Sequence, residues 1–481
     1  MNQNHTPLFD ALKDYHSRGV IPFDVPGHKH GQGLQEMSTY FGEKMLQLDV
    51  NSMKCLDNLS HPTSCIKEAE DLLAAAYGAD YGFFMVNGTS SSVQAMIMSV
   101  CQPGDKIILP RNAHKSATNG MILSGVLPVY VQPEICDELG IAMGVTVEAV
   151  KAAIEANLDA KAVFIINPTY YGATSDLKSI IELAHSYNMA VLVDEAHGAH
   201  FHFHDELPPS ATSLGADLVA ASVHKTGGSL TQSSVLLMNK GFVNKKYVRT
   251  IINLTQTTSA SYLLMSSLDI ARKNLALNGQ RILSHVLELS RYARGILNET
   301  HGLYAFAREL EGTPGVHLFD ETKLTINVTG LGLTGFEAYD ILRDEYNIQL
   351  ELGDANNVLA IMSLGDTKEH IDALIDAFKD LSKRFAHQTK LTYVHVPMDC
   401  PKTAMSPREA FYRDKVSVTL RDAIGRISGE SLMAYPPGIP TVTPGELITE
   451  DMVDYIEYLK EQNTLLTDLE DENLEMIKVI E

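Results

Sequence analysis

The chain has 481 residues, of which 45% are hydrophobic and 20% charged, an ordinary balance for a globular protein of two to four domains. Its formal net charge of −22 argues against nucleic acid or an anionic membrane as the main partner. The cysteines form no CxxC pair, the N-terminus lacks a signal-peptide pattern and no apolar run approaches membrane-spanning length, so we expect a cytoplasmic protein.

The first 48 residues are expected to form an extension, with one short helix (PLFDALKDYHSRG) before a Pro/Gly-rich stretch. Residues 65–78 predict a helix that closes on Gly78. Short apolar runs then alternate with helical patterns, at 81–87, 106–110, 127–131, 162–167, 190–196, 217–224 and 233–239. This alternation is typical of a mostly parallel sheet that is covered on both faces.

A long helical stretch over about 262–300 leads into a second, smaller α/β region, and a third region opens with the extended piece LTYVHVPM (391–398). We therefore predict four parts. They are an N-terminal extension (1–48), a large domain (49–270), a small α/β domain (271–385) and a C-terminal α+β domain (386–481).

Lys225 and Asp194 follow apolar strand patterns. Alternation along 217–224 places Ser222 and His224 on one strand face. Gly227 and Gly228, shortly after Lys225, let the backbone turn and approach a ligand closely. A buried lysine is suited to Schiff-base formation, although a strand-end lysine in solvent is the alternative.

Asp194 lies at the carboxyl end of its predicted strand, where open α/β sheets bind ligands. A buried carboxylate there needs a cation such as a protonated pyridine nitrogen. A structural or helix-capping aspartate is the alternative.

Two further segments follow predicted strands. NGTSSS (87–92) precedes a helical pattern, so its backbone N–H groups and hydroxyls form a phosphate cradle or an ordinary N-cap cluster. His114, in RNAHKS, follows the predicted strand at 106–110. It either lies over an aromatic ring at the end of the sheet or has a structural role. Cradle, histidine, aspartate and lysine together describe four contacts to one cofactor, pyridoxal 5′-phosphate.

The stretch HGAHFHFHDE (197–206) alternates histidines in a way that would place three imidazoles on one strand face. Zinc sites usually gather ligands from separate segments or at fixed helical spacing, and no HExxH occurs. We therefore expect no metal site here, but a polar strand or loop.

Beyond these features the sequence resembles the bacterial ornithine/lysine/arginine decarboxylases, and most closely the short arginine decarboxylases. The resemblance runs along the whole chain, in VPGHKHG, NGTSSS, PRNAHKS, INPTYYG, VDEAHGAHFHFHDELP, SVHKTGGSLTQSS, TTSASYLL, SPREAFY and YPPGIPTVTPGE. It implies the aspartate aminotransferase-like fold, fold type I of the pyridoxal-phosphate-dependent enzymes, with a C-terminal α+β domain.

The resemblance also implies roles for single residues. Lys225 is then the Schiff-base lysine, Asp194 pairs with the pyridine nitrogen and His114 stacks on the ring. The remaining positions that it assigns to cofactor binding are Gly88, Thr89, Ser90, Ala196, His197, Ser222, His224 and Thr257. The long members carry tryptophan where His197 stands, which leaves its role open. Thr257 matches a position that reaches the phosphate of a neighbouring subunit, so the implied assembly is at least a homodimer with active sites at the interface.

The implied activity is decarboxylation of a basic L-amino acid, L-arginine giving agmatine and CO2 for polyamine biosynthesis. Lysine or ornithine is the alternative substrate, and an aminotransferase on the same fold is the rival enzyme class. A non-catalytic relative would typically lack Lys225 or Asp194, and both are present. Either Lys225 or His224 returns a proton to carbon after CO2 leaves. Glu446, in TPGE, is a candidate carboxylate for the basic end of the substrate, or else a first-turn acid of the following helix.

Overall fold

The computed structural model describes residues 1–391, 400–434, 438–462, 464–473 and 475–481. The chain divides into two compact units, each built from distant segments: unit 1 holds 1–99 and 193–283, and unit 2 holds 100–192 and 284–481. The predicted boundaries after residues 48, 270 and 385 stay a prediction. The extended piece predicted at 391–398 lies, beyond its first residue, outside the described residues.

The seven apolar runs form the strands of one seven-stranded sheet, in the order β1–β10–β9–β8–β6–β2–β3. Strand β10 is antiparallel to β1 and β9, whereas β2 is parallel to β3 and β6. The bounds are β1 Tyr81–Met85, β2 Lys106–Pro110, β3 Leu127–Val131, β6 Ala162–Ile166, β8 Ala190–Asp194, β9 Leu218–Ala221 and β10 Ser234–Met238. The predicted sheet is confirmed, with β10 as its antiparallel exception.

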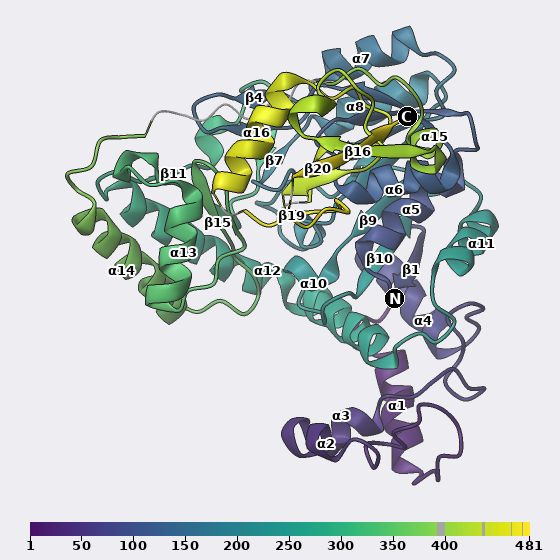
Figure 1. The fold of residues 1–481 in the computed structure, drawn as a ribbon. Helices are drawn as coiled ribbons and strands as arrows, with labels where there is room; N and C mark the ends of the chain where they lie inside the picture. Colours follow the sequence, from purple (N-terminus) through teal and green to yellow (C-terminus); the bar gives the residue numbers. More distant parts are fainter. Residues whose placement is uncertain (392–399, 435–437, 463, 474) are drawn as a thin grey trace. The chain divides into compact units, whose positions relative to one another are not determined.

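Unit 1 contains strands β1, β9 and β10 and the end of β8, together with mostly short helices. Its helices are α1 Pro7–Ser17, α2 Gln35–Phe41, α3 Glu43–Gln47, α4 Cys65–Ala76, α5 Gly88–Val100, α9 Ala211–Leu214, α10 Val223–Thr226, α11 Lys245–Thr255 and the first part of α12 Tyr262–Asn298. The predicted helix at 65–78 is confirmed as α4. Figure 1 shows α1, α2 and α3 together at one end of this unit, away from β1 and β10.

Helix α1 is fastened within unit 1 by two buried charged residues of α12. Asp269 Oδ2 accepts the backbone N–H of Leu8, at 3.1 Å, which satisfies a donor of the first helical turn. Arg272 donates to the carbonyl oxygens of Gln3, at 2.9 Å, and His5, at 2.6 Å, and pairs with Asp269. The start of the N-terminal extension is therefore held by polar contacts rather than by apolar packing alone.

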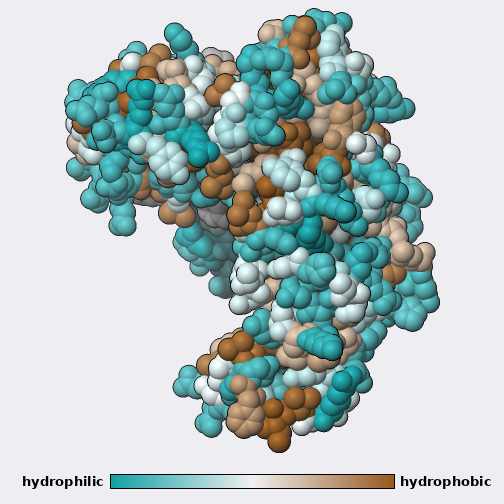
Figure 2. Space-filling view, turned by 90° about the vertical axis from the view of Figure 1, so that its right-hand side faces the viewer, coloured by the Kyte–Doolittle hydropathy of each residue, from teal (hydrophilic) through white to brown (hydrophobic). Residues whose placement is uncertain are grey.

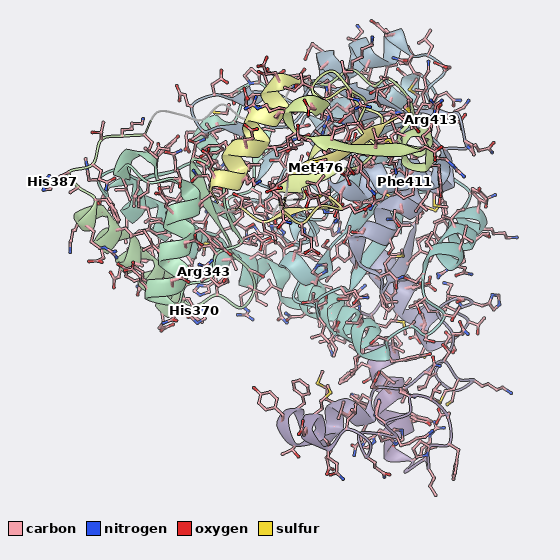
Figure 3. The ribbon with its side chains drawn as sticks, viewed as in Figure 1. Arg343, His370, His387, Phe411, Arg413 and Met476 are labelled. Carbon is pink, nitrogen blue, oxygen red and sulfur yellow. The ribbon has the colours of Figure 1, made fainter. Side chains whose placement is uncertain are left out.

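Unit 2 holds the other strands of the large sheet, with α6 Lys115–Ser124, α7 Val147–Ala156 and α8 Leu177–Ser186. Its four-stranded antiparallel sheet has the order β11–β13–β15–β14. These strands are Tyr304–Ala305, Lys323–Asn327, Asn357–Ile361 and Leu352–Gly353, and two helices, α13 Gly335–Tyr346 and α14 Lys368–Arg384, share their apolar core. Helices α13 and α14 bury Leu342 and Ile371, while Arg343 and His370 point outward (Figure 3). This region matches the predicted small α/β fold.

The C-terminal part of unit 2 has its own apolar core, which includes Leu432, Val442 and Ile456. Antiparallel pairs and one longer helix surround it. They are β16 Lys415–Thr419 with β20 Met476–Ile480, β17 Leu432–Ala434 between β18 Pro440–Val442 and β19 Leu466–Thr467, α15 Pro407–Tyr412 and α16 Glu450–Glu461. Unit 2 also contains four two-residue strands, β4 Ile135–Cys136, β5 Ile141–Ala142, β7 Ala173–Thr174 and β12 Leu318–Phe319. Within the described ranges, no helix has the length and apolar character needed to cross a membrane.

Candidate active site

Lys225 lies on a short helix rather than on a strand. Strand β9 ends at Ala221, Ser222 caps the next helix with extended backbone angles, and α10 carries His224 and Lys225. The predicted strand is therefore wrong beyond residue 221, and so is the strand face that Ser222 and His224 were expected to share. The chain turns here because Ser222 adopts an N-cap conformation, and β propensity in such a run does not reveal the cap.

The glycines after Lys225 have different structural reasons. A Cβ at Gly227 would lie 2.8 Å from Cγ1 of Val223, so the close packing at this position leaves no room for a side chain. Gly228 has a φ of +83°, a conformation that L-residues rarely adopt. The expected turn after Lys225 is present, and the close approach to a ligand stays a prediction.

Asp194 is the last residue of β8 and is only 6% exposed. Burial raises the pKa of its carboxyl above the usual value, while the N–H of Ala196, 3.1 Å from Oδ1, and the charge of Lys225 favour the carboxylate. A buried carboxyl group at a strand's carboxyl end is the feature that the sequence predicted.

His197 lies beside Lys225, with 2.8 Å between His197 Nε2 and Lys225 Nζ. The His197 side chain is 6% exposed, and the turn that carries it follows directly from Asp194. Asp194, His197 and Lys225 are therefore gathered within unit 1. The sequence pointed to all three residues but not to the contact between the last two.

Helix α5 begins at Gly88, directly after β1, as expected of the NGTSSS segment. Gly88 has a φ of +76°, and a Cβ placed on it would meet no atom within 4 Å. Thr89 is buried, and Ser90 of the same first turn is exposed. Open space thus lies beside the first turn of this helix, whose N–H groups have no acceptor within the helix.

Three hydroxyl groups converge beside this turn. Thr89 Oγ1 hydrogen-bonds to Ser222 Oγ and lies 2.6 Å from Ser234 Oγ. Ser234 Oγ in turn lies 2.8 Å from the Ala221 carbonyl. Ser234, the first residue of β10, was missed by sequence reasoning, although a hydroxyl residue that opens a fully buried strand was an available signal.

His224 directs its Nδ1 to the carbonyl oxygen of Ser233, 2.9 Å away. A carbonyl only accepts hydrogen bonds, so Nδ1 of His224 carries a proton in this arrangement. The same segment, SLTQSS, also supports α5, because the carbonyl of Gln232 accepts the N–H of Gly88 at 3.0 Å.

Thr257 follows α11 and is exposed, with its Oγ1 accepting the N–H of Ser259 at 3.2 Å. Its predicted reach to a neighbouring subunit stays a prediction. The preceding Gln256 is buried and accepts the N–H of Val86, at 2.9 Å, just before the phosphate-cradle segment.

The other two predicted site residues belong to unit 2. His114 is the N-cap of α6 and accepts the N–H of Ser116 through Nδ1, at 3.2 Å. Glu446 is 1% exposed and pairs with Arg111. The alternative role of Glu446 as a first-turn acid is wrong, because α16 begins at Glu450 with Thr449 as its cap.

The histidine-rich stretch does not form a strand. Residues Phe201–Phe203 form a single 3₁₀ turn, so His200, His202 and His204 do not share a strand face. In the part of the chain that the structure describes, no group of three or more His, Cys, Asp and Glu side chains is arranged to hold a metal ion.

Comparisons with known proteins cover essentially the whole chain. Residues 6–370 match the family description "Orn/Lys/Arg decarboxylase, major domain", and residues 387–472 match "Orn/Lys/Arg decarboxylase, C-terminal domain". The arginine decarboxylase of Bacillus anthracis is 46% identical over 100% of this chain and 98% of its own length, and that of Bacillus subtilis is 46% identical over 100% and 99%.

Among solved structures, the lysine decarboxylase LdcF of Francisella novicida superposes with a TM-score of 0.85. The superposition covers 99% of this chain and 81% of that one at 21% sequence identity, which is evidence of a shared fold. The predicted fold class, aspartate aminotransferase-like with a mostly parallel central sheet, is confirmed.

Proposed function

Since the chain belongs to the Orn/Lys/Arg decarboxylase family, as its motifs predicted, we propose that it decarboxylates L-arginine to agmatine and CO2 with pyridoxal 5′-phosphate as cofactor. The observation that carries the proposal is the placement of Lys225 Nζ beside His197 and within electrostatic reach of buried Asp194. We propose arginine rather than lysine or ornithine as the substrate, because relatives that are 46% identical to the whole chain are named arginine decarboxylases. Agmatine would then serve polyamine biosynthesis in the cytoplasm.

The residues of unit 1 fit this cofactor. A phosphate group is bound by backbone N–H groups at a helix start and by hydroxyls, and the first turn of α5 offers both beside the open space at Gly88. Thr89, Ser222 and Ser234 would supply hydroxyls. Ser90, in the same first turn as Thr89, and His224, two residues after Ser222, are the further proposed contacts. When bound, pyridoxal phosphate supplies a sink for the electron pair that CO2 leaves behind.

The remaining residues have distinct proposed tasks. Asp194 would hold positive charge on the pyridine nitrogen, and the N–H of Ala196 keeps its carboxylate oriented. Lys225 would bind the cofactor covalently through Nζ. The stacking role of His114 and the substrate-binding role of Glu446 rest on the family resemblance.

We propose that the active protein is a homodimer or a larger homo-oligomer with active sites at the interface. The stretch between α1 and β1 supports this, because its apolar side chains Ile21, Phe23 and Tyr40 are 78%, 93% and 86% exposed. Figure 2 shows brown side chains gathered at the end of unit 1 that contains α2 and α3. Apolar side chains exposed together mark an interaction surface. Light scattering should give a mass of at least two chains for the wild type and a lower one for Phe23→Ser/Tyr40→Ser.

A competition assay tests the proposed reaction. The purified protein, loaded with pyridoxal phosphate, receives equal concentrations of arginine, lysine and ornithine, and CO2 and amine products are quantified together. We expect agmatine in amounts equal to the CO2 released, and neither product from Lys225→Ala. Cadaverine or putrescine as the main product would overturn the substrate, whereas keto acid without CO2 would overturn decarboxylation in favour of an aminotransferase.

A further inference from the structure

The contact between His197 and Lys225 has a chemical consequence for the proposed reaction. We propose that His197 is the proton partner of Lys225: His197 Nε2 takes the proton that the Lys225 ammonium must lose before Nζ is able to bond to carbon, and returns it afterwards. The observation is the 2.8 Å separation of Nε2 and Nζ. This inference rests on the proposed function, because it concerns the residue that would carry the cofactor.

The donor inventory of the two side chains fixes the direction of the hydrogen bond. A lysine ammonium has three donors and no acceptor, so Nε2 accepts from it and carries no proton of its own. In the transfer an N–H bond of Nζ breaks, an N–H bond of Nε2 forms, and imidazole becomes imidazolium while Nζ keeps its lone pair. A neutral amine is the nucleophilic form of lysine.

The turn that carries His197 is tightly built, so the histidine is held where this transfer is possible. The N–H of Gly198 donates to the Glu195 carbonyl at 2.9 Å. A Cβ on Gly198 would lie 2.8 Å from Cγ of Glu195 and 2.9 Å from the ring of Phe201, so a larger residue would displace the turn. His197 is only 6% exposed, so bulk water has little access to its ring.

The neighbouring histidine is oriented differently. His224 points Nδ1 at the Ser233 carbonyl before β10, which fixes that nitrogen as a donor. His197 instead presents Nε2 to Lys225 itself. The sequence leaves either Lys225 or His224 to return a proton to carbon. The geometry favours Lys225, which receives that proton from His197. His197 acts through Lys225 and is therefore a positioning residue. The charge of Lys225 also acts on the buried carboxyl of Asp194.

A first experiment uses the cofactor-free protein. Hydrogen–deuterium exchange at the imidazole C2 position, followed by mass spectrometry across pH, reports the protonation midpoint of each histidine. The Lys225 charge disfavours imidazolium, so Lys225→Met should move the His197 midpoint to higher pH. The midpoint of exposed His285 should not move. An unchanged His197 midpoint would overturn the coupling, and this readout does not depend on activity or on the proposed reaction.

A second experiment follows the rate at which pyridoxal phosphate attaches to Lys225 after mixing, across pH. His197→Gln keeps a polar side chain but cannot take the proton, so attachment should slow at least tenfold near neutral pH. The difference in attachment rate between His197→Gln and the wild type should become smaller as pH rises, because hydroxide then removes the proton of the Lys225 ammonium. Added imidazole should restore part of the attachment rate of His197→Gln. His285→Gln should match the wild type. Equal slowing at every pH would mean a structural role and would overturn the proposal. If no variant attaches the cofactor, the His197 exchange midpoint still decides the coupling.

Discussion

Arg111 and Glu446 form a buried ion pair, with Arg111 Nη2 2.9 Å from Glu446 Oε2 and side-chain exposures of 8% and 1%. Arg111 also donates to the carbonyls of Pro440, at 2.8 Å, and Thr441, at 3.1 Å. It follows β2 directly, so one guanidinium joins the end of β2 to β18 and the TPGE segment. Burial raises the pKa of the Glu446 carboxyl, against the charge of Arg111. This gives Glu446 a structural role that the sequence prediction did not include.

Removal of Arg111 should be more harmful than removal of both partners. Arg111→Met leaves the Glu446 carboxylate buried without its cation, which costs about 3–5 kcal/mol, whereas Arg111→Met/Glu446→Leu removes both charges and should cost less. Urea unfolding measures the free energies. Exposed Arg421, which pairs with Asp454 and Glu457, is the control, where Arg421→Met should cost no more than about 1 kcal/mol. A double variant less stable than the single one would contradict the account.

Glu195 should give the protein a specific pH dependence. Burial raises the pKa of its carboxyl well above the usual value, against the hydrogen bond from the Ala211 N–H at 2.7 Å. The folded state therefore holds a proton that the unfolded state releases, so stability from this group is full below the unfolded pKa and is lost as pH rises toward the folded one. Glu195→Gln cannot ionise and keeps the amide oxygen as an acceptor.

The free energy of unfolding of Glu195→Gln, relative to the wild type, should thus increase by about 1 kcal/mol or more between pH 5 and pH 7. Denaturant titrations at the two pH values measure it. Glu182→Gln, at an exposed position of α8, should show no such increase. If the relative free energy of unfolding of Glu195→Gln stays constant or decreases between the two pH values, Glu195 is ionised in the folded protein.

Arg272 should control the order of the N-terminus. Arg272→Met removes the donors to Gln3 and His5 and leaves buried Asp269 without its cation. Amide exchange of a peptide over residues 1–17 should accelerate at least tenfold, while exchange in β1 changes less. Lys178→Met, at an exposed ion pair, should leave both regions unchanged. Wild-type protection of α1 in Arg272→Met would show that apolar packing alone holds this helix.

Ser234, which sequence reasoning missed, should contribute to cofactor affinity. Ser234→Ala removes one of the three converging hydroxyls, and a lost hydrogen bond to a charged group costs about 1.5–3 kcal/mol. Fluorescence titration of the cofactor-free protein should therefore show pyridoxal phosphate binding at least tenfold more weakly. Ser186→Ala, at an exposed position, is the matched control. Equal affinities of Ser234→Ala and the wild type for pyridoxal phosphate would show that the phosphate group does not bind at the Ser234 hydroxyl.

The sequence predicted the large sheet well because strands buried on both faces read as continuous apolar runs, and each run from Tyr81 to Met238 became a strand. It placed Asp194 correctly at the end of a buried strand, because a charge that ends such a run lies at the strand's end. It placed Lys225 on the wrong element, since an N-cap at Ser222 depends on backbone angles that a short run does not determine. The contacts of His197 and Ser234 are tertiary, formed across segments, and no local pattern encodes their partners.

The most direct test of the central claim is to locate the covalent cofactor. The protein is loaded with pyridoxal phosphate, reduced with borohydride, digested and mapped by mass spectrometry. The account predicts one modified lysine, Lys225 in the peptide that contains SVHKTGG, and no modification in Lys225→Ala. Modification of another lysine in the wild type, such as Lys115 beside His114, or an unmodified protein, would contradict it.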